Sequence, residues 1–475
     1  MKRIWLLALG AAAALVLLGL TFKPVVEGDG VGYFIYLHSV VSDHDLQLAN
    51  EYAAARAAHL NGAAAWLSIR TPTGLTADYF PVGPALLSLP AYLPVSLVAG
   101  RLAAPVGVFG TPLTAAFTLA SLLYGLLALA LAYRLAREVL GSGRAAAGGV
   151  AAAAFATPFV YYLLFEPSYS HTFSTFMVTA FVYAWWRTRG ERTAAAWLGL
   201  GLIGGLMAVT RWQDALLLGL VLVDLPAVRW RASLFPLGVA VGFAPQLAVD
   251  RALWGAWLPV RPPGQTLSLL DGHYWQVLLS SHHGLFVWTP AALIALLGIW
   301  LLPSRRLQLA FVYAFCAELV INGAAPDWWG GFAFGARRFL DLLPFWALAL
   351  GALAQALRPR VAWALTALLA AWNVVLIANF AYVIRLDRDP GYAGLLSGQL
   401  QALQYVPHLF AQGAAVRSLL PGHLVTGALP PAAGLGILIL ELAAIGVAAA
   451  IGFQRASSTR AEWAGSHQLA PPETR

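Results

Sequence analysis

The chain has 475 residues, of which 60% are hydrophobic and 11% charged, and its formal net charge is +8. A soluble domain carries about 25% charged residues, so this composition excludes a water-soluble protein and predicts a membrane protein. The single cysteine, Cys316, excludes an internal disulfide. The arginines lie in short stretches between apolar segments, which favours a topology signal over nucleic-acid binding.

Thirteen apolar segments follow one another along the chain. They run to about 20 residues without alternation, so they predict spanning helices rather than strands. The first follows Lys2 and Arg3 and is interpreted as an uncleaved span. We expect an all-α polytopic membrane protein with about twelve (11–13) transmembrane helices. The segments cover 4–22, 84–104, 112–133, 146–165, 171–187, 194–210, 214–229, 232–249, 283–302, 307–323, 341–357, 361–382 and 431–453.

Arginines mark every second connection from Arg134 onward, which predicts that these connections are cytoplasmic, together with the N-terminus. The alternate, outer connections carry few arginines but many other polar residues. Segments 84–104 and 112–133 cannot both cross, because Arg134 would then lie outside. The first of them contains Pro84, Pro90 and Pro94, so we predict that it is re-entrant or interfacial.

Residues 1–455 are predicted to form a single transmembrane domain. Its first outer loop, 23–80, is too long for a simple connection and is expected to carry short interfacial helices. A second long outer loop covers 383–430. The polar residues 456–475 are predicted to be a disordered cytoplasmic tail.

Polar and aromatic residues concentrate in the outer loops, and the predicted topology brings them to one membrane face. Such a group suits a sugar carried on a phosphate, because aromatic rings stack on sugars and arginine forks hold phosphate. The candidate catalytic residue is Asp29, and the candidate phosphate ligands are Arg337, Arg338 and Arg211. The candidate pocket residues are Glu27, Tyr33, Asp43, Asp45, Glu51, Tyr79, Glu166, His171, Gln213, His282, His283, Trp328 and Trp329.

Several of these residues also have simpler interpretations. Asp29 lies between two glycines, which allow a close backbone approach, but it could be a solvated loop carboxylate. Asp43, His44 and Asp45 could bind a divalent metal, although adjacent residues do not all point at one ion; no metal ligand or cofactor is assigned. Arg211 and Asp214 could simply pair with each other.

Two further interpretations concern charged residues, at the start of a helix and within apolar segments. Arg337 and Arg338 begin a helix, where a cation requires an anionic partner against the helix dipole. Glu318 and Glu441 lie within apolar segments, where ionisable groups usually face an interior.

The long loop that carries Asp29 directly after the first span resembles the GT-C superfamily of membrane glycosyltransferases. Closer resemblance to bacterial members of that superfamily lies in Gly28–Tyr33, Asn50–Tyr52, Tyr79–Pro84, Ser281–Pro290 and Trp328–Arg338. The resemblance implies a GT-C-like bundle and a polyprenyl-phosphate-linked sugar donor. It also implies an acidic residue in the first loop that activates the acceptor, a position that Asp29 matches.

The resemblance therefore implies inverting transfer to a lipid, glycan or protein acceptor on the outer face of a bacterial inner membrane. Many relatives carry two adjacent acids at this position, whereas Gly30 follows Asp29 here. The residue that takes the place of the second acid is not identified; the candidates are Glu27, Asp43 and Asp45. The alternatives are a transporter of lipid-linked sugars, which would usually show inverted repeats, and a non-catalytic assembly protein.

Overall fold

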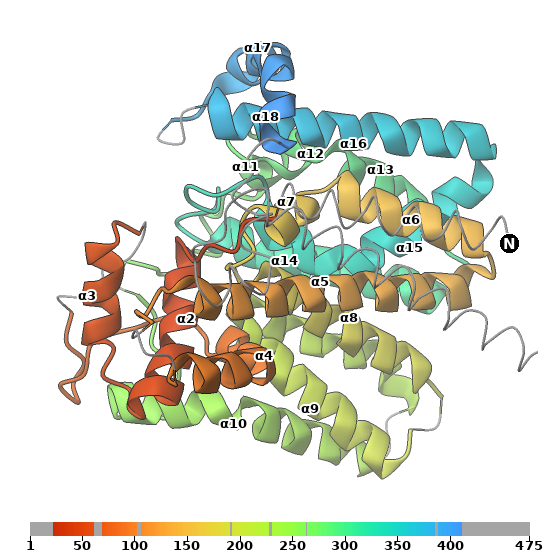
Figure 1. Cartoon of the computed structure of the whole chain (residues 1–475). Coiled ribbons are helices and arrows are strands. Elements are labelled where there is room, and N and C mark those ends of the chain that lie inside the picture. Colours follow the sequence, from red (N-terminus) through yellow and green to blue (C-terminus); the bar gives the residue numbers. More distant parts are fainter. Residues whose placement is uncertain are drawn as a thin grey trace, which may run out of the picture. The chain divides into compact units, whose positions relative to one another are not determined.

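The computed structural model describes residues 22–410 except 61–68, 102–105, 191, 228–229, 263 and 385–387. Four predicted regions lie outside this part of the chain. They are residues 4–21 of the first apolar segment, loop residues 411–430, segment 431–453 and the tail 456–475. Residues Pro24–Leu409 form one unit, and the described residues form helices and no strand (Figure 1).

The helices of the first half follow the predicted segments. They are α2 (Asp29–His38), the π-helical turn η1 (Ser39–Asp43), α3 (Ala49–Ala57), α4 (Gly83–Ala99), α5 (Thr111–Leu140), α6 (Gly143–Phe155), α7 (Phe159–Leu164), α8 (His171–Arg187), α9 (Ala194–Thr210), the 3₁₀ segments η2 (Trp212–Ala227) and η3 (Trp230–Ser233), and α10 (Leu234–Trp254).

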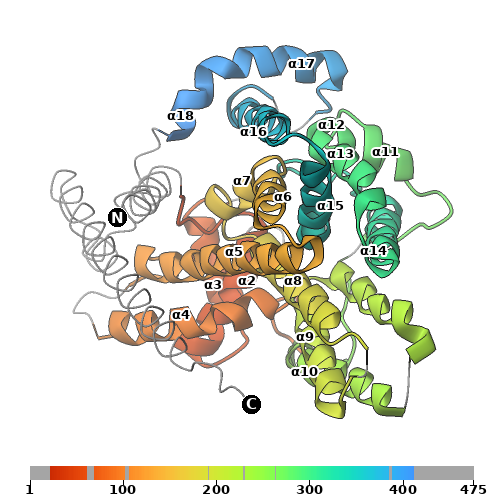
Figure 2. The ribbon, with the colours of Figure 1, turned by 90° about the vertical axis from the view of Figure 1, so that its right-hand side faces the viewer.

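The second half contains α11 (Tyr274–Leu279), α12 (Leu285–Trp288), α13 (Pro290–Gly298), η4 (Ile299–Leu301), α14 (Arg305–Ala324), η5 (Arg337–Leu342), α15 (Leu343–Ala356), α16 (Pro359–Tyr382), α17 (Gly391–Ala402), η6 (Leu403–Tyr405) and α18 (Val406–Phe410). In the view from the side, α5, α6 and α15 pack together and α16 covers them (Figure 2).

Five helices among the described residues are long and apolar enough to cross a membrane. They cover Thr111–Leu140, Trp230–Trp254, Arg305–Ala324, Arg337–Ala356 and Pro359–Tyr382. Three shorter apolar helices cover Gly83–Ala99, Ala194–Thr210 and Pro290–Leu301. These helices confirm a multi-pass, all-α membrane protein.

The arginine-rich connections lie at one end of the long helices, as their alternation predicted. Asp224 in η2 accepts a 2.6 Å bond from Arg192 and also pairs with Arg306 at the start of α14. Glu138 near the end of α5 pairs with Arg187 at the end of α8, at 3.5 Å. Connections far apart in sequence therefore meet at the same end.

Helix α4 does not take the chain from one end to the other. Its first residue, Gly83, lies against Thr210 at the end of α9, away from the arginine-rich end. Phe34 in α2 contacts Tyr92 of α4, and also Phe109 and Phe117 around the start of α5. Since α4 begins and α5 begins on the same side, the described geometry favours the predicted re-entrant or interfacial arrangement.

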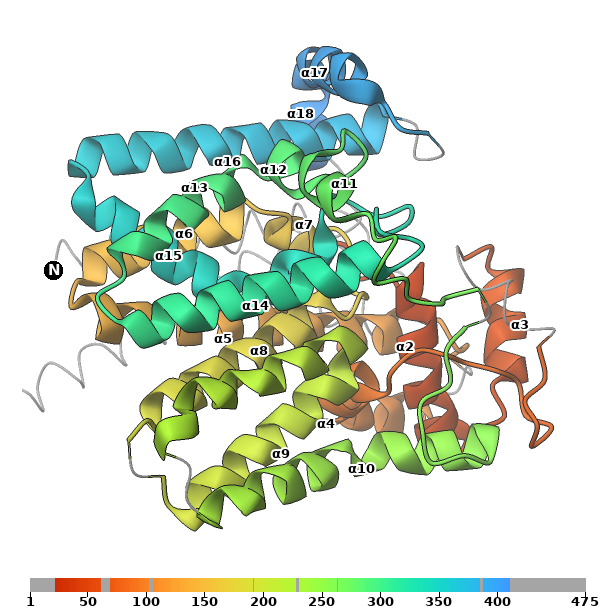
Figure 3. The same ribbon diagram turned by 180° about the vertical axis from the view of Figure 1, so that it is seen from behind.

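The first long loop carries the short helices α2 and α3, as predicted. From behind, they lie at the same end of the long helices as α11, α12 and the chain that follows α14 (Figure 3). An aromatic core around Phe34 fixes α2 there, because this ring is fully buried. Near the end of the loop, Asp78 is also buried, and its Oδ1 accepts a 2.8 Å bond from the Phe80 backbone N–H.

The burial of Asp78 makes stability depend on pH. Burial raises the pKa of this carboxyl to about 8, against about 3.9 in an unfolded chain. Between these two pKa values the folded protein keeps a proton that the unfolded chain has released. The free energy of unfolding therefore falls as the pH rises through this range, up to about 8. Asp78→Asn keeps the acceptor for Phe80. Between pH 5 and pH 8, we expect the melting temperature of the wild type to fall relative to that of Asp78→Asn.

Thermal unfolding of the purified protein in detergent measures this difference. Asp271→Asn, which changes an exposed loop carboxylate, serves as the matched control and should follow the wild type. A wild type and an Asp78→Asn variant with parallel pH profiles would contradict a protonated, buried Asp78.

Candidate active site

Asp29 forms an ion pair with Arg337, which lies 308 positions later in the chain. Arg337 Nη1 donates to Asp29 Oδ2 at 2.6 Å. Asp29 begins α2, where the helix N-terminus also favours a negative charge. Its side chain keeps 33% of its surface exposed, against 13% for Arg337. The carboxylate is thus held by a guanidinium on one side and stays accessible to a substrate.

The two glycines around Asp29 allow the close approach that the sequence predicted. Gly28 has φ +57°, and a Cβ there would lie 2.1 Å from the Tyr169 hydroxyl. A Cβ on Gly30 would lie 2.2 Å from Ser168 Oγ. Ser168 Oγ also accepts from the Glu27 backbone N–H at 3.3 Å. The loop before α8 therefore packs directly on the backbone that carries Asp29.

A methyl group at Gly30 should disturb this packing. Gly30→Ala would also meet the Ser168 carbonyl oxygen at 2.9 Å, and overpacking of this kind costs about 1–3 kcal/mol. We expect a lower melting temperature than in the wild type. Gly199→Ala, where a Cβ has nothing within 4 Å, is the control and should not be destabilised. An unchanged melting temperature in Gly30→Ala would contradict the contact with Ser168.

The chain between α14 and α15 shapes the cationic side of the site. Arg337 Nε donates to the Gly330 carbonyl at 3.0 Å, and the guanidinium lies 5.2 Å from the Tyr169 ring centre. Arg338 Nη2 bonds Asp327 at 2.6 Å, which closes the loop between them. Burial alone would raise the pKa of Asp327, but the neighbouring Arg338 lowers it. Both arginines at this helix start thus have anionic partners, and these are carboxylates.

A second group of polar residues, centred on Arg211, is buried behind the Asp29–Arg337 pair. Arg211 Nη1 contacts His171 Nδ1 at 2.7 Å and Asp341 Oδ2 at 3.1 Å. The hydrogen bond from Arg211 makes Nδ1 of His171 an acceptor. Gln213 accepts from Arg211 at 2.9 Å and donates to the Arg338 carbonyl at 3.0 Å. The carboxylate that forms an ion pair with Arg211 is therefore Asp341, not Asp214 as the sequence allowed.

Tyr33 belongs to the same region. Burial raises the pKa of its hydroxyl, and the nearby Asp29 carboxylate raises it further, with Ser170 acting in the opposite sense. The hydroxyl therefore stays protonated and can donate a hydrogen bond. Arg211 and Arg337 both lower the pKa of this hydroxyl electrostatically, so Tyr33 lies near both arginines.

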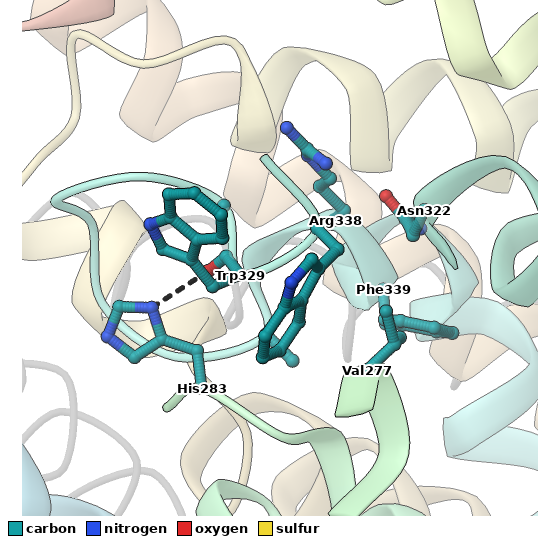
Figure 4. A pocket seen from close by; sticks show the side chains of 9 residues that line it. Val277, His283, Asn322, Trp329, Arg338 and Phe339 are labelled. Atoms are coloured by element: carbon teal, nitrogen blue, oxygen red, sulfur yellow. Dashed lines mark hydrogen bonds between the residues drawn. The ribbon is translucent and has the colours of Figure 1, made fainter. Parts of the chain in front are cut away.

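A small pocket, with room for about one water molecule, lies beside Arg338. In Figure 4, His283 is bonded to Trp329 on one side of this pocket, and Asn322 and Arg338 lie on the other. His283 Nδ1 donates to the Trp329 carbonyl at 2.8 Å, and the His282 ring stacks on Trp329. The lining residues are Val277, His283, Asn322, Trp328, Trp329, Gly330, Ala336, Arg338 and Phe339.

Other candidate residues form a separate cluster in the first loop. His38 Nδ1 lies 3.2 Å from Glu51 Oε1 and 3.9 Å from Asp43 Oδ2. Burial raises the pKa of Glu51. Ligand atoms of these three residues lie within 4.8 Å of one another, so they could hold a divalent metal. Of the predicted set Asp43, His44 and Asp45, only Asp43 belongs to this group.

Three other candidates contact residues outside the Asp29–Arg337 pair. Asp45 Oδ1 accepts from Ser39 and from the Gln47 backbone, both at 3.0 Å. The Tyr79 ring lies 4.8 Å from the Trp254 ring. Glu166 Oε1 accepts a 3.3 Å bond from the Tyr161 hydroxyl. None of these three contacts involves Asp29 itself, and the pocket role of the three residues stays a prediction.

The sequence did not single out Ser168, Tyr169, Asp327 or Asp341. Ser168 and Tyr169 lie within the stretch Glu166–His171, of which the two end residues alone are predicted site residues. Asp341 follows Arg337 by four positions, a spacing that puts two residues on one helical face. Asp327 opens the stretch that ends at Arg338. The spacing of Arg337 and Asp341 suggests a pair between them, whereas Asp341 bonds Arg211 and Arg337 bonds Asp29, so this spacing was not a usable signal.

These groups together can carry out displacement chemistry on a phosphate-linked substrate. Asp29 can accept a proton from a hydroxyl, Arg338 presents a cation to the pocket, and aromatic rings of Trp328 and Trp329 provide stacking surfaces. Electrostatic stabilisation of this kind needs fixed donors. The bonds of Arg337 to Asp29 and Gly330 and of Arg338 to Asp327 fix both guanidinium groups.

No family model and no curated protein matches this chain. Solved structures do. ArnT from Cupriavidus metallidurans bound to undecaprenyl phosphate matches with a TM-score of 0.55 and 16% identity, over 99% of this chain and 81% of that one. ArnT from the same organism in the apo state also matches with a TM-score of 0.55 and 16% identity, over 94% and 77%. The chain therefore has the same fold as ArnT, an all-α fold of the kind that its resemblance to GT-C proteins implied.

Proposed function

We propose that this chain is a membrane glycosyltransferase that moves a sugar from a polyprenyl-phosphate donor to a hydroxyl of a cell-envelope acceptor. The observation that carries the proposal is the 2.6 Å pair between Asp29 and Arg337. It places an accessible carboxylate among fixed arginines, aromatic rings and a small pocket. The ArnT structure with the same fold binds undecaprenyl phosphate, which supports a donor of this class.

In this proposal the acceptor hydroxyl gives its proton to Asp29 as its oxygen attacks the anomeric carbon. The new carbon–oxygen bond forms while the bond from that carbon to the phosphate oxygen breaks. The polyprenyl phosphate leaves with the bonding electrons. A single displacement inverts the anomeric carbon. A general base of this type contributes about 10²–10⁴-fold to the rate.

The contacts divide the three candidate arginines between different roles. Arg337 uses Nη1 and Nε on Asp29 and Gly330, so it positions the carboxylate. Arg338 uses Nη2 on Asp327 and lines the pocket, so its remaining donors are assigned to the donor phosphate. Arg211 is bonded to His171, Asp341 and Gln213, so we assign it to support rather than to direct phosphate binding.

The arginine-rich connections favour a site on the outer face of the inner membrane by the positive-inside rule. The polar groups gather at one end of the long helices, whereas a transporter usually binds its substrate near the midplane. The end location favours transfer over transport. Trp328, Trp329 and His282 are assigned to the sugar, since their rings form a contiguous aromatic group beside the pocket, with His282 stacked on Trp329 and Trp328 edge-to-face to both.

Mass spectrometry of cell-envelope glycans tests the proposal. A strain that lacks the chain should lose one sugar modification, and expression of the wild type should restore it. The initial rate of restoration, divided by the amount of inserted protein, measures transfer. A deletion strain whose envelope lipids, glycans and proteins all keep their sugars would contradict the proposed function.

A further inference from the structure

Three fully buried carboxylates meet behind the two arginines of the candidate active site. They come from separate elements: Asp214 from the start of η2, Glu318 from α14 and Asp341 from η5. Each residue has 0% of its surface exposed. One carboxylate oxygen of each lies within 4.8 Å of the others. We call this group the acidic triad.

Each member of the triad is held by one of its oxygens. Asp214 Oδ2 accepts a hydrogen bond from Ser174, and Asp341 Oδ2 accepts one from Arg211. Glu318 Oε2 accepts from Gln213 at 2.8 Å and from Asn322 at 3.1 Å. Within the described part of the chain, the second oxygen of each carboxylate has no hydrogen-bond donor. These atoms are Asp214 Oδ1, Glu318 Oε1 and Asp341 Oδ1.

The charges of the triad are not balanced by its ion pair. Arg211 makes the one ion pair to the triad that the described residues contain. Arg337 and Arg338 are paired with Asp29 and Asp327 instead. Three carboxylates and one guanidinium leave two negative charges in a buried site, where uncompensated charge is costly. One divalent cation or two protons would neutralise them.

We propose that the acidic triad binds one divalent cation through carboxylate oxygens. Its ligands are all oxygens, which suit Mg²⁺, Mn²⁺ or Ca²⁺, and neither histidine nor cysteine belongs to the triad. One oxygen from each of the three carboxylates can form one side of a coordination shell, and water completes it. The first-loop cluster of His38, Asp43 and Glu51 is a different site with a different ligand chemistry.

A single hydrogen-bonded residue, Asn322, links the pocket beside Arg338 to the triad. Asn322 lines that pocket and donates to both the backbone carbonyl and the side chain of Glu318, one helical turn earlier. Gln213 bridges Glu318 to the Arg338 carbonyl, so the bound cation would fix the backbone that carries both arginines.

The binding test does not depend on the proposed function, because it measures the cation itself. Mn²⁺ is titrated into the purified full-length chain, and the EPR signal of free Mn²⁺ counts the bound ions. The protein carries Asp43→Asn and Glu51→Gln to disable the first-loop cluster. We expect one bound Mn²⁺ per chain in this background, displaced by excess Mg²⁺ or Ca²⁺. Adding Glu318→Gln should lower the affinity at least 10-fold, whereas adding Glu138→Gln should leave it unchanged.

A second measurement needs no change in the triad. Cys316 is the single cysteine of the chain and is exposed on α14, two positions before Glu318. A nitroxide attached there should be broadened by Mn²⁺ bound at the triad and not by Ca²⁺. A background protein that binds no Mn²⁺, a Glu318→Gln variant that binds it equally, or an unbroadened nitroxide would overturn the proposal. In each case protons, rather than a cation, neutralise the triad.

Discussion

Replacing Asp29 by asparagine should lower the rate of sugar transfer about 10²–10⁴-fold, the contribution typical of a general base. The amide keeps the size of the side chain, and its oxygen can still accept the 2.6 Å bond from Arg337. It cannot take up a proton from the acceptor hydroxyl. We therefore expect a large loss of rate in the glycan-restoration assay with little loss of folded, inserted protein.

The control for Asp29→Asn is a substitution of another carboxylate that forms an ion pair with an arginine, at the other end of the helices. Glu138 pairs with Arg187 at 3.5 Å, and Glu138→Gln should keep the wild-type rate. Asp29→Glu keeps the basic group but moves it by one methylene, so its rate should lie between those of the wild type and Asp29→Asn. A near-normal rate for Asp29→Asn would remove Asp29 from the mechanism.

Replacing Arg337 by lysine should also lower the transfer rate strongly, by about 10²–10³-fold, as for other fixed electrostatic groups in active sites. The planar guanidinium bonds Asp29 and the Gly330 carbonyl at the same time and lies over the Tyr169 ring. A lysine ammonium has the same charge but cannot reproduce this fork. Asp29 would keep a cation nearby and lose its fixed orientation.

A matched substitution separates this effect from general destabilisation. Arg187→Lys changes the exposed pair with Glu138, where an ion pair contributes about 0–1 kcal/mol, so its rate and melting temperature should both match the wild type. If Arg337→Lys transferred sugar at the wild-type rate, the orientation of Asp29 by the guanidinium would have no role in the reaction.

The helical framework was predictable because hydrophobicity is a local property of the sequence. The apolar segments between 84 and 382 coincide with helices, and the arginine-rich connections meet at one end. The prolines of α4 and the conflict in arginine alternation pointed to the element that does not cross. The number of crossings depends also on segments 4–22 and 431–453, so about twelve stays a prediction.

The partners within the site were less predictable, because they depend on long-range packing. The two glycines signalled a close approach to Asp29, but not that Ser168 and Tyr169 make it. The anionic partner of Arg337 was predicted as a phosphate, and the structure places the Asp29 carboxylate there. No local pattern could indicate that a residue in the first loop meets one 308 positions later.

The two acidic clusters show the same limit. Asp43 was expected to act with its neighbours in sequence, whereas the helical turn between α2 and α3 brings it to His38 and Glu51. Glu318 was recognised as an ionisable group at apolar depth, but its partners Asp214 and Asp341 come from other elements. Contacts between helices set these groups, so single segments could not reveal them.

The central claim is that Asp29 enables consumption of a polyprenyl-phosphate-linked sugar. Mass spectrometry of membrane lipids measures this consumption whichever sugar and acceptor the reaction uses. Cells that express Asp29→Asn in place of the wild type should accumulate one polyprenyl-phosphate sugar and lack the matching envelope modification. Unchanged levels of every polyprenyl-phosphate sugar, with the modification intact, would contradict the claim.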